Sequence, residues 1–335
     1  MPKIVRFHRL GGPEELRLEE AAPETPQAGE VRIRVQAVGL NNSEAQLRRG
    51  DYPMLKASFP SRIGRECAGI VDAVAPDVES IRVGDLVSTI PAFDIQRNGV
   101  YGDWCVVPQA AIVRVPPGMG RIEAAAVWQQ YLTAYGPLVE YGRADERHVV
   151  LITAGASSVG LGAIQMAKTL GCKVVATTRS AGKTGVIRRA GADHVIVTET
   201  ERLASSILDA TGGKGFDLAL DPIAGPGLEA LAASAASGAT IFLYGQLAPE
   251  PTPFPLVSVM RKGLSIRGYT LWEITLDPAR RERAVRFICD GLETKRLQPI
   301  IDRVFDLSDI VAAHRYLESG RQAGKIVVTT GGPSE

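Results

Sequence analysis

The pattern of apolar and polar positions changes about one third of the way along the chain. Before residue 120, short alternating or β-branched runs are each closed by Gly, Pro, Asp or Asn. The clearest of these runs are residues 31–40, 68–74, 85–90 and 110–116. Alternation of this kind is typical of half-buried strands, so this segment is predicted to be mostly β.

After Pro117, apolar runs alternate with longer helical stretches. Six runs are predicted strands: residues 149–154, 174–178, 194–197, 216–221, 239–245 and 264–269. The intervening helices are expected to begin at Val159, Ala181, Glu201 and Gly225. Gly171 and Gly191 stand where C-terminal helix caps are expected. This order predicts a doubly wound parallel sheet whose ligand site lies beyond the carboxyl ends of the strands.

The end of the chain returns to a different pattern. After Thr270, a long helical stretch covers residues 277–296 and a terminal strand covers residues 324–330. We assign this tail to the β-rich domain. The predicted organisation is therefore a β-rich domain of residues 1–122 and 270–335, interrupted by a dinucleotide-binding domain of residues 123–269.

A candidate phosphate-binding loop follows the strand at residues 149–154. Dinucleotide-binding loops have the motif G-x-G-x-x-G. Here Gly155 can make the tight turn and Gly160 allows close helix packing, but Ser157 stands in place of the middle glycine. The hydroxyls of Ser157 and Ser158 can donate to pyrophosphate, while the helix start at Val159 supplies amides and the helix dipole. The alternative is an ordinary strand-to-helix turn.

The residues after the next strand indicate which dinucleotide would bind. An NAD site places an acidic residue there to hold the ribose 2′-hydroxyl. This chain instead has Thr178, Arg179 and Ser180, with Lys183 close behind. Because both cations can pair with a 2′-phosphate, NADPH is the predicted cofactor. The alternative is that Arg179 and Lys183 are solvated cations at the start of a helix.

Composition and charge exclude several other functions. Thirty-eight basic and 37 acidic residues give a net charge of +1 without long charged runs, so neither nucleic acid nor a membrane surface is an expected partner. The amino terminus lacks the apolar core of a signal peptide, and no membrane-spanning run is present. Four well-separated cysteines fit reduced thiols and a cytoplasmic location. The four histidines are isolated and are interpreted as surface or hydrogen-bonded residues.

Seven segments, taken in order, carry a family resemblance. They are residues 37–53, 64–74, 83–87, 124–138, 152–168, 190–196 and 324–330. Together they resemble the medium-chain dehydrogenase/reductase superfamily, and within it the zinc-free quinone oxidoreductase and enoyl reductase branch. The resemblance covers nearly the whole chain and implies an α/β fold: a GroES-like β-rich catalytic domain plus a Rossmann doubly wound parallel sheet.

The positions that hold zinc in other members of that superfamily are changed here. Asn41 stands where those members have a cysteine, and Arg65 stands where they have a histidine. Neither side chain is a credible zinc ligand, and Glu66 alone cannot hold the metal. The closely spaced cysteines of the structural zinc loop are also absent. We therefore expect no metal, and an electron-poor conjugated acceptor is an easier substrate than an alcohol.

The resemblance also implies which residues serve the reaction. Asn41, Gln46 and Tyr52 would belong to the loop facing the nicotinamide, with Tyr52 as a candidate proton donor, although an aromatic residue is more usual than Gln46. Thr133 would contact the nicotinamide ribose or ring, and Gly245 and Lys325 would add cofactor contacts. The alternative for Tyr52 is that it only packs against its neighbours. The alternative for Asn41 is that it only forms the turn of the loop.

Three functions remain in competition. The leading hypothesis is an NADPH-dependent reductase of a quinone or of the C=C bond of an α,β-unsaturated carbonyl compound. The others are a metal-free carbonyl or alcohol dehydrogenase and a non-catalytic NADPH-binding protein. A homodimer is also expected, because related reductases pair through edge strands such as residues 239–245 and 264–269. Residues 254–260 would either add apolar area to that contact or form an internal loop or helix.

Overall fold

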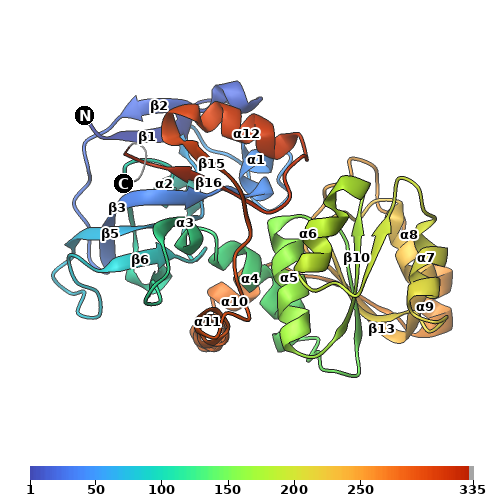
Figure 1. The fold of residues 1–335 in the computed structure, drawn as a ribbon. Helices are drawn as coiled ribbons and strands as arrows, with labels where there is room; N and C mark the ends of the chain where they lie inside the picture. The colour runs from blue at the N-terminus through green and yellow to red at the C-terminus, as the bar shows by residue number, and fades with distance from the viewer. Residues whose placement is uncertain (332–335) are drawn as a thin grey trace. The chain divides into compact units, whose positions relative to one another are not determined.

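The computed structural model describes residues 1–331 and divides into two compact units (Figure 1). The first unit comprises Met1–Gln129 with Ile301–Glu335, and the second comprises Gln130–Ile300. The first contains mixed and antiparallel sheets, whereas the second contains one parallel sheet covered by helices. The predicted α/β fold, a β-rich domain plus a doubly wound sheet, is confirmed.

The first unit is built on a seven-stranded sheet of order β15-β16-β3-β5-β6-β8, with β7 also paired to β3. Its strands are β3 (Glu30–Gly39), β5 (Glu66–Val74), β6 (Leu86–Thr89), β7 (Trp104–Pro108), β8 (Ile112–Arg114), β15 (Ile301–Asp306) and β16 (Lys325–Thr329). A smaller sheet has the order β2-β1-β4, formed by β1 (Lys3–Phe7), β2 (Arg17–Glu20) and β4 (Ser61–Arg62). Its helical elements are α1 (Asn42–Arg49), α2 (Ile95–Asn98), α3 (Arg121–Ala124), α12 (Ile310–Glu318), η1 (Pro13–Glu15), η2 (Gln109–Ala111) and η5 (Leu307–Asp309).

Strand β3 organises the first unit because it pairs on both sides. Its alternating apolar positions, including Ile33 and Val35, are buried in a core shared with β5 and α12. The register places Gly39 opposite Glu66 of β5 on one side and opposite Val327 of β16 on the other. Residues from distant parts of the sequence are thereby brought together at the carboxyl end of β3.

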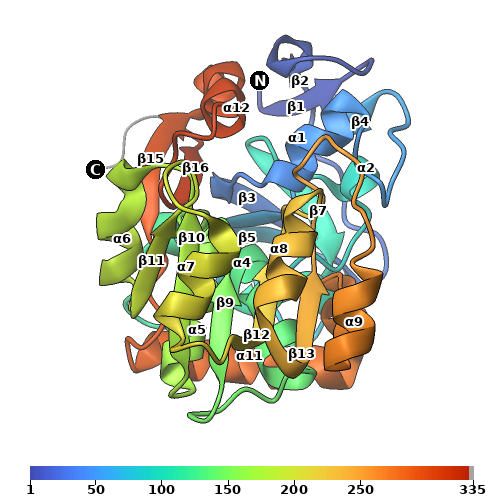
Figure 2. The same ribbon diagram turned by 90° about the vertical axis from the view of Figure 1, so that its right-hand side faces the viewer.

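The second unit has a six-stranded parallel sheet of order β11-β10-β9-β12-β13-β14 (Figure 2). The strands are β9 (Val149–Ile152), β10 (Lys173–Thr178), β11 (His194–Val197), β12 (Phe216–Asp221), β13 (Ala235–Leu243) and β14 (Ser265–Gly268). Its helical elements are α4 (Trp128–Tyr135), η3 (Gly136–Glu140), α5 (Ser158–Thr169), η4 (Ala181–Lys183), α6 (Thr184–Arg189), α7 (Leu203–Ala210), α8 (Gly227–Ser234), α9 (Leu256–Lys262), α10 (Trp272–Thr275) and α11 (Pro278–Glu293). The first two residues of α4 still belong to the first unit. Figure 1 shows α5 and α6 on one face of this sheet and α7, α8 and α9 on the other.

The predicted elements of this sheet agree with the structure to within a few residues at most ends. All six predicted strands form, and Gly171 and Gly191 adopt positive φ angles of 85° and 114° after α5 and α6. Ala181 begins a 3-10 turn, so the α-helix itself starts at Thr184. Residues 254–260 lie in helix α9 and directly before it, and this helix buries none of its residues.

Helix α11 lies in the second unit, so the compact units meet at residues 130 and 301 rather than at the predicted 123 and 270. The reason is side-chain contact with the segment that follows α4. Phe287 packs edge-on against Tyr135, with ring centroids 5.7 Å apart. The guanidinium of Arg283 lies 2.9 Å from a carboxylate oxygen of Glu140.

Two further sequence-based expectations concern the whole chain. Within residues 1–331, none of the helices combines the length and the apolar character that crossing a membrane requires. All four cysteines are free thiols, and Cys67, Cys105 and Cys172 are buried. Cys289 is partly buried.

Candidate functional site

The turn between β9 and α5 has the shape that a phosphate-binding loop needs. The Gly155 N–H donates to the carbonyl of Thr177 at 2.7 Å, which holds the turn against β10. A Cβ at Gly160 would lie 2.5 Å from the Ala154 carbonyl oxygen, so a larger residue does not fit there. Ala154 itself has a φ of 48°, in the left-handed region. A Cβ at Gly155 would lie 3.2 Å from the Thr177 carbonyl oxygen, a tight contact, so it is Gly160 whose replacement the backbone excludes.

Ser157, which replaces the middle glycine of the motif, is the N-cap of α5. Its Oγ accepts a hydrogen bond from the Gly160 N–H at 3.0 Å. Because this bond uses a lone pair, the Ser157 hydroxyl proton is left to donate to a bound anion. Ser158 and Val159 open the helix and are partly exposed. The first-turn amides of a helix lack partners within the helix and can bind an anion.

The end of β10 presents a cation. Thr178 is buried, whereas Arg179 is exposed and makes no hydrogen bond or ion pair with any other residue in the range 1–331. Ser180 and Lys183 follow in the turn η4 and are partly buried. The first charged side chain after β10 is therefore that of Arg179. An NAD site would have a carboxylate here to bind the ribose 2′-hydroxyl.

The strand order places a second loop beside the first. Strands β9 and β12 are neighbours at the point where the order reverses, and β12 ends in the buried Asp221. The Asp221 carboxylate accepts from the Thr153 hydroxyl and from the Ala224 N–H, the latter at 2.8 Å. Burial raises the pKa of this carboxyl group, and the hydrogen bonds oppose that shift. Asp221 thus ties the loop after β12 to the loop after β9.

Gly245 lies on the same edge of the sheet, two residues after β13. It is exposed, and a Cβ there would lie 2.8 Å from the Pro222 carbonyl oxygen. The loops after β9, β10 and β13 therefore gather the predicted cofactor residues of this unit, except Thr133, at the carboxyl ends of the strands. Sequence reasoning missed Asp221, although its place at the end of a buried strand was a usable signal.

In the first unit, Asn41 and Glu44 form a capping box at the start of α1. The Asn41 N–H donates to Glu44 Oε2 at 2.8 Å, and Asn41 Nδ2 donates to the Gly39 carbonyl and to Glu44 Oε1. Glu44 also accepts from the Arg65 N–H at 2.8 Å and from the Tyr101 hydroxyl at 2.5 Å. Complete burial raises the pKa values of Glu44 and Tyr101.

A buried ion pair completes this cluster. Lys325 Nζ pairs with Glu66 and also donates to Asn41 Oδ1 at 2.7 Å. The other Glu66 oxygen accepts from the Gln129 N–H at 2.5 Å. A Cβ at Gly39 would lie 2.7 Å from Lys325 Cε, so the glycine leaves room for the ion pair. The Asn41 amide is thus held through both its nitrogen and its oxygen.

Tyr52 and Gln46 lie close by in the sequence of the same unit. Gln46 is a partly buried residue of α1, and Tyr52 lies in the loop after it and packs partly against the main core. The guanidinium carbon of Arg65 lies 5.6 Å from the centre of the Tyr52 ring. Burial raises the pKa of Tyr52, with Glu44 acting in the same direction and Arg65 in the opposite one.

The predicted residues fall into two groups, one in each unit. Asn41 and Lys325 are in direct contact in the first unit. Thr133 is a buried residue of α4 in the second unit, which also holds the phosphate loop. The first unit also contains Glu44 and Tyr101, which sequence reasoning missed. Glu44 could have been found, because Asn41 and Glu44 have the spacing of a capping box.

The residues at the zinc positions of related proteins do not fit a metal ion. Glu66 is paired with an ammonium group, and the oxygen of Asn41 accepts from that same ammonium. Arg65 places a second cation where a histidine ligand would stand. Among residues 1–331, no cluster of three His, Cys, Asp or Glu side chains is arranged to hold a metal.

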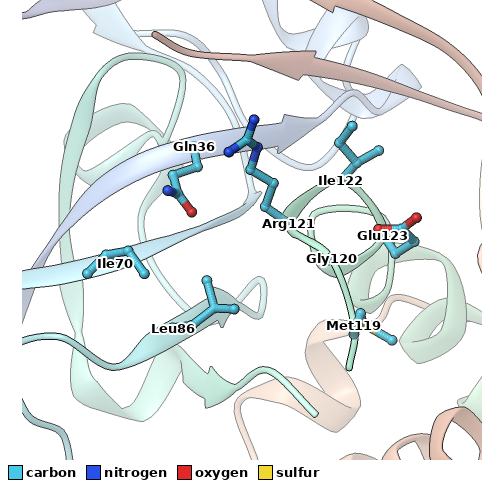
Figure 3. A pocket seen from close by; sticks show the side chains of 8 residues that line it. All are labelled: Gln36, Ile70, Leu86, Met119, Gly120, Arg121, Ile122 and Glu123. Carbon is cyan, nitrogen blue, oxygen red and sulfur yellow. The ribbon is translucent and has the colours of Figure 1, made fainter. Parts of the chain in front are cut away.

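A separate hollow of about 430 Å³ opens on the first unit (Figure 3). It is lined by Gln36, Ile70, Leu86, Met119, Gly120, Arg121, Ile122 and Glu123. None of the predicted site residues lines it, so this hollow is distinct from the cluster around Asn41.

The strand order of the second unit and its glycine turn before a helix define a Rossmann dinucleotide-binding unit. Together with the β-rich unit, they define the two-domain class of dehydrogenases and reductases. Two family descriptions match: "Alcohol dehydrogenase GroES-like domain" over residues 27–117 and "Zinc-binding dehydrogenase" over residues 158–288. The β-rich unit is therefore GroES-like, as expected.

Curated relatives cover nearly the whole chain. A quinone oxidoreductase of Pseudomonas aeruginosa is 30% identical, with 98% of this chain and 99% of that protein covered. A phenolphthiocerol/phthiocerol polyketide synthase of Mycobacterium tuberculosis is 29% identical over 97% of this chain. The chain spans only 15% of the length of that synthase.

Solved structures show the same fold. The Escherichia coli quinone oxidoreductase complexed with NADPH superposes with a TM-score of 0.90 at 26% identity, covering 98% of this chain and 99% of that one. An NAD-dependent alcohol dehydrogenase superposes with a TM-score of 0.90 at 29% identity, covering 99% and 100%. The chain belongs to the medium-chain dehydrogenase/reductase superfamily, in its quinone oxidoreductase and enoyl reductase branch.

Proposed function

We propose that this chain is an NADPH-dependent oxidoreductase that reduces a quinone, or the C=C bond of an α,β-unsaturated carbonyl compound, without zinc. The observation that carries the proposal is the exposed Arg179 at the end of β10, beside a strand-to-helix turn that carries Gly155 and Gly160. The similar quinone oxidoreductase of E. coli, described as complexed with NADPH, supports the same cofactor.

The second unit supplies the cofactor site in this proposal. The turn at Gly155, the Ser157 hydroxyl and the first-turn amides of α5 would hold the pyrophosphate, because they combine donors with the positive end of the helix dipole. Arg179 would pair with the 2′-phosphate, helped by Lys183. Gly245 would allow close approach at the loop after β13, and Thr133 would contact the nicotinamide. When bound, the reduced nicotinamide supplies a hydride.

The first unit supplies the residues for the acceptor. Tyr52 would donate its hydroxyl proton where negative charge develops on the acceptor, and Gln46 would help to orient it. Both nitrogen protons of Asn41 are already used within the unit, so its role would be to fix the start of α1. Lys325 would act through Asn41 and Glu66, to which its ammonium is bound.

The same cluster supports the proposed independence from zinc. A Lewis acid normally polarises the carbonyl or alcohol oxygen in the zinc-containing members. Here the ammonium of Lys325 occupies the acceptor atoms that Asn41 and Glu66 would offer to a metal. An acceptor that is electron-poor by conjugation needs less polarisation, which favours quinones and enones over simple ketones.

The test is a substrate screen with purified protein. NADPH oxidation would be followed with 1,4-naphthoquinone, 2-cyclohexenone and an enoyl thioester, and the organic products would be identified. We expect hydroquinone or the saturated carbonyl compound, and we expect Tyr52→Phe to lower kcat on enones by roughly 10²-fold if Tyr52 is the proton donor.

An alcohol dehydrogenase is the second candidate, because an NAD-dependent alcohol dehydrogenase has the same fold. Reversible oxidation of simple alcohols, without reduction of any quinone or enone, would favour that function and overturn our proposal. Tight NADPH binding without turnover of any substrate would favour a non-catalytic role.

We also propose that the chain forms a homodimer through its second unit. Strand β14 is an edge strand of the parallel sheet, so one side of its backbone has no strand partner among residues 1–331. Exposed apolar residues lie on the neighbouring helix α9 and the segment before it: Phe254, Leu256, Val257 and Met260. Pairing of β14 strands about a twofold axis would satisfy the edge and cover this apolar surface.

A further inference from the structure

Arg65 is a buried cation with a specific neighbour. Only 3% of its surface is exposed, and its guanidinium carbon lies 5.6 Å from the centre of the Tyr52 ring. Its backbone is fixed as well, because its N–H donates to Glu44 at 2.8 Å and its carbonyl lies 3.5 Å from the Thr89 hydroxyl. A buried guanidinium carries a large desolvation cost, so the groups around it decide how its charge acts.

The other charges of the cluster are arranged differently. Lys325 is bound directly to Glu66, so these two charges largely cancel each other. Glu44 is surrounded by donors, which are the backbone N–H groups of Asn41 and Arg65 and the hydroxyl of Tyr101. Arg65 is therefore the cation of this cluster that lies against the Tyr52 ring.

We propose that Arg65 is a positioning residue that stabilises the phenolate form of Tyr52 after the Tyr52 hydroxyl has given its proton to the reduced acceptor. This inference rests on the proposed function of Tyr52 as proton donor. The position of Arg65 is where zinc-containing relatives have a metal ligand. A fixed guanidinium thus supplies positive charge to the site from the protein itself.

The proposed reaction balances in atoms and charge. A hydride adds to the β-carbon of the enone, and the π electrons move to the carbonyl oxygen to give an enolate. The Tyr52 O–H bond breaks and its proton forms a C–H bond at the α-carbon of the enolate, which becomes the saturated ketone and leaves Tyr52 as a phenolate. Water then returns a proton to Tyr52. Arg65 lowers the free energy of the phenolate by charge attraction, because its guanidinium lies over the ring into which the phenolate charge is delocalised.

The titratable groups that bear on Tyr52 come from three elements. Arg65 precedes β5, and Glu44 lies on α1. Asp51, next to Tyr52 in the loop, is exposed and paired with Arg49. Removing the guanidinium leaves Glu44 as the main charged neighbour, so Tyr52 should become harder to ionise.

The experiment measures Tyr52 ionisation without cofactor or substrate. The protein would be labelled with fluorotyrosine at its eight tyrosines, and the Tyr52 signal in the fluorine NMR spectrum would be assigned with Tyr52→Phe. In Arg65→Met and Arg65→Gln, we expect Tyr52 to ionise at higher pH than in the unmodified protein. Arg65→Lys, which keeps a cation, should shift the signal less. With NADPH and an enone, Arg65→Met should lower kcat on the order of tenfold, with a smaller change in KM.

Arg62→Met is the matched control. Arg62 is also buried, and its guanidinium carbon lies 4.8 Å from the Trp104 ring, not beside Tyr52. This variant shows what the loss of a different buried arginine in the same unit does to Tyr52. We expect it to leave the pH at which Tyr52 ionises unchanged. The inference would be overturned if Tyr52 ionised at the same pH in the unmodified protein, in Arg65→Gln and in Arg65→Lys. A shifted Tyr52 signal without any reductase activity would support the charge coupling but overturn the proposed function.

Discussion

His314 should make the stability of the first unit depend on pH. This residue of α12 is completely buried, and neither ring nitrogen has a hydrogen-bond partner among residues 1–331. Its ring packs edge-on against Tyr101, with centroids 5.8 Å apart. The interpretation of all four histidines as surface or hydrogen-bonded residues is therefore wrong for His314, because α12 carries its ring into the core.

Burial lowers the pKa of His314 from 6.5 to about 3, and the positive charges of Arg48 and Arg49 act in the same direction. The folded protein therefore keeps this ring neutral over a range in which the unfolded chain binds a proton. The unfolded state gains this proton as the pH falls through 6.5, so stability is present above that pH and is lost below it. The slope is about 1.4 kcal/mol per pH unit, which gives a loss of about 2 kcal/mol between pH 8 and pH 5.

Urea unfolding at pH 8 and pH 5 measures this effect through tryptophan fluorescence. Trp104 and Trp128 lie in the same unit as His314, so they report on its unfolding. The unmodified protein should lose more free energy of unfolding between pH 8 and pH 5 than His314→Leu does. The difference between the two losses should be about 2 kcal/mol. His194→Leu, at an exposed position, should behave like the unmodified protein. If the unmodified protein and His314→Leu lost equal stability between pH 8 and pH 5, the reasoning would be refuted.

Three other outcomes are expected. NADPH should bind at least about tenfold more tightly than NADH, and Arg179→Ala with Lys183→Ala should remove most of that preference in a calorimetric titration; equal affinities in the unmodified protein would count against the cofactor proposal. Elemental analysis should find no stoichiometric zinc, and a chelator should leave activity unchanged, whereas one zinc lost together with activity would contradict zinc independence. Light scattering should report twice the 35.8 kDa chain mass. Met260→Lys, at a position 75% exposed, should shift the measured mass toward that of the monomer without unfolding the protein. A fully active monomer at all concentrations would exclude the dimer.

Local patterns were enough to predict the second unit. Its six strands and the caps at Gly171 and Gly191 follow from hydrophobic periodicity and from the positive φ that glycine adopts easily. The glycines of the phosphate loop were also readable, because strand, turn and helix are consecutive in the sequence. The role of Ser157 was not, since its hydrogen bond to the Gly160 N–H depends on the loop conformation.

Contacts between distant residues could not be predicted in the same way. Lys325 and Asn41 are 284 positions apart, and they meet because β16 pairs with β3 in one particular register. The long helix α11 lies in the second unit because its side chains contact residues 135–141, which its own amphipathic pattern does not specify.

The sequence by itself determined the fold class, the glycine turn after β9 and the cation Arg179 after β10, since these depend on neighbouring residues and on chemical identity. Only the tertiary structure decided that Glu66 is paired with Lys325, that Asn41 has both nitrogen protons engaged, and that Arg65 lies against Tyr52. The physical reason is that the free energy of a buried charge depends on the groups that pair with it. Strand register selects those groups, and no local sequence pattern specifies that register.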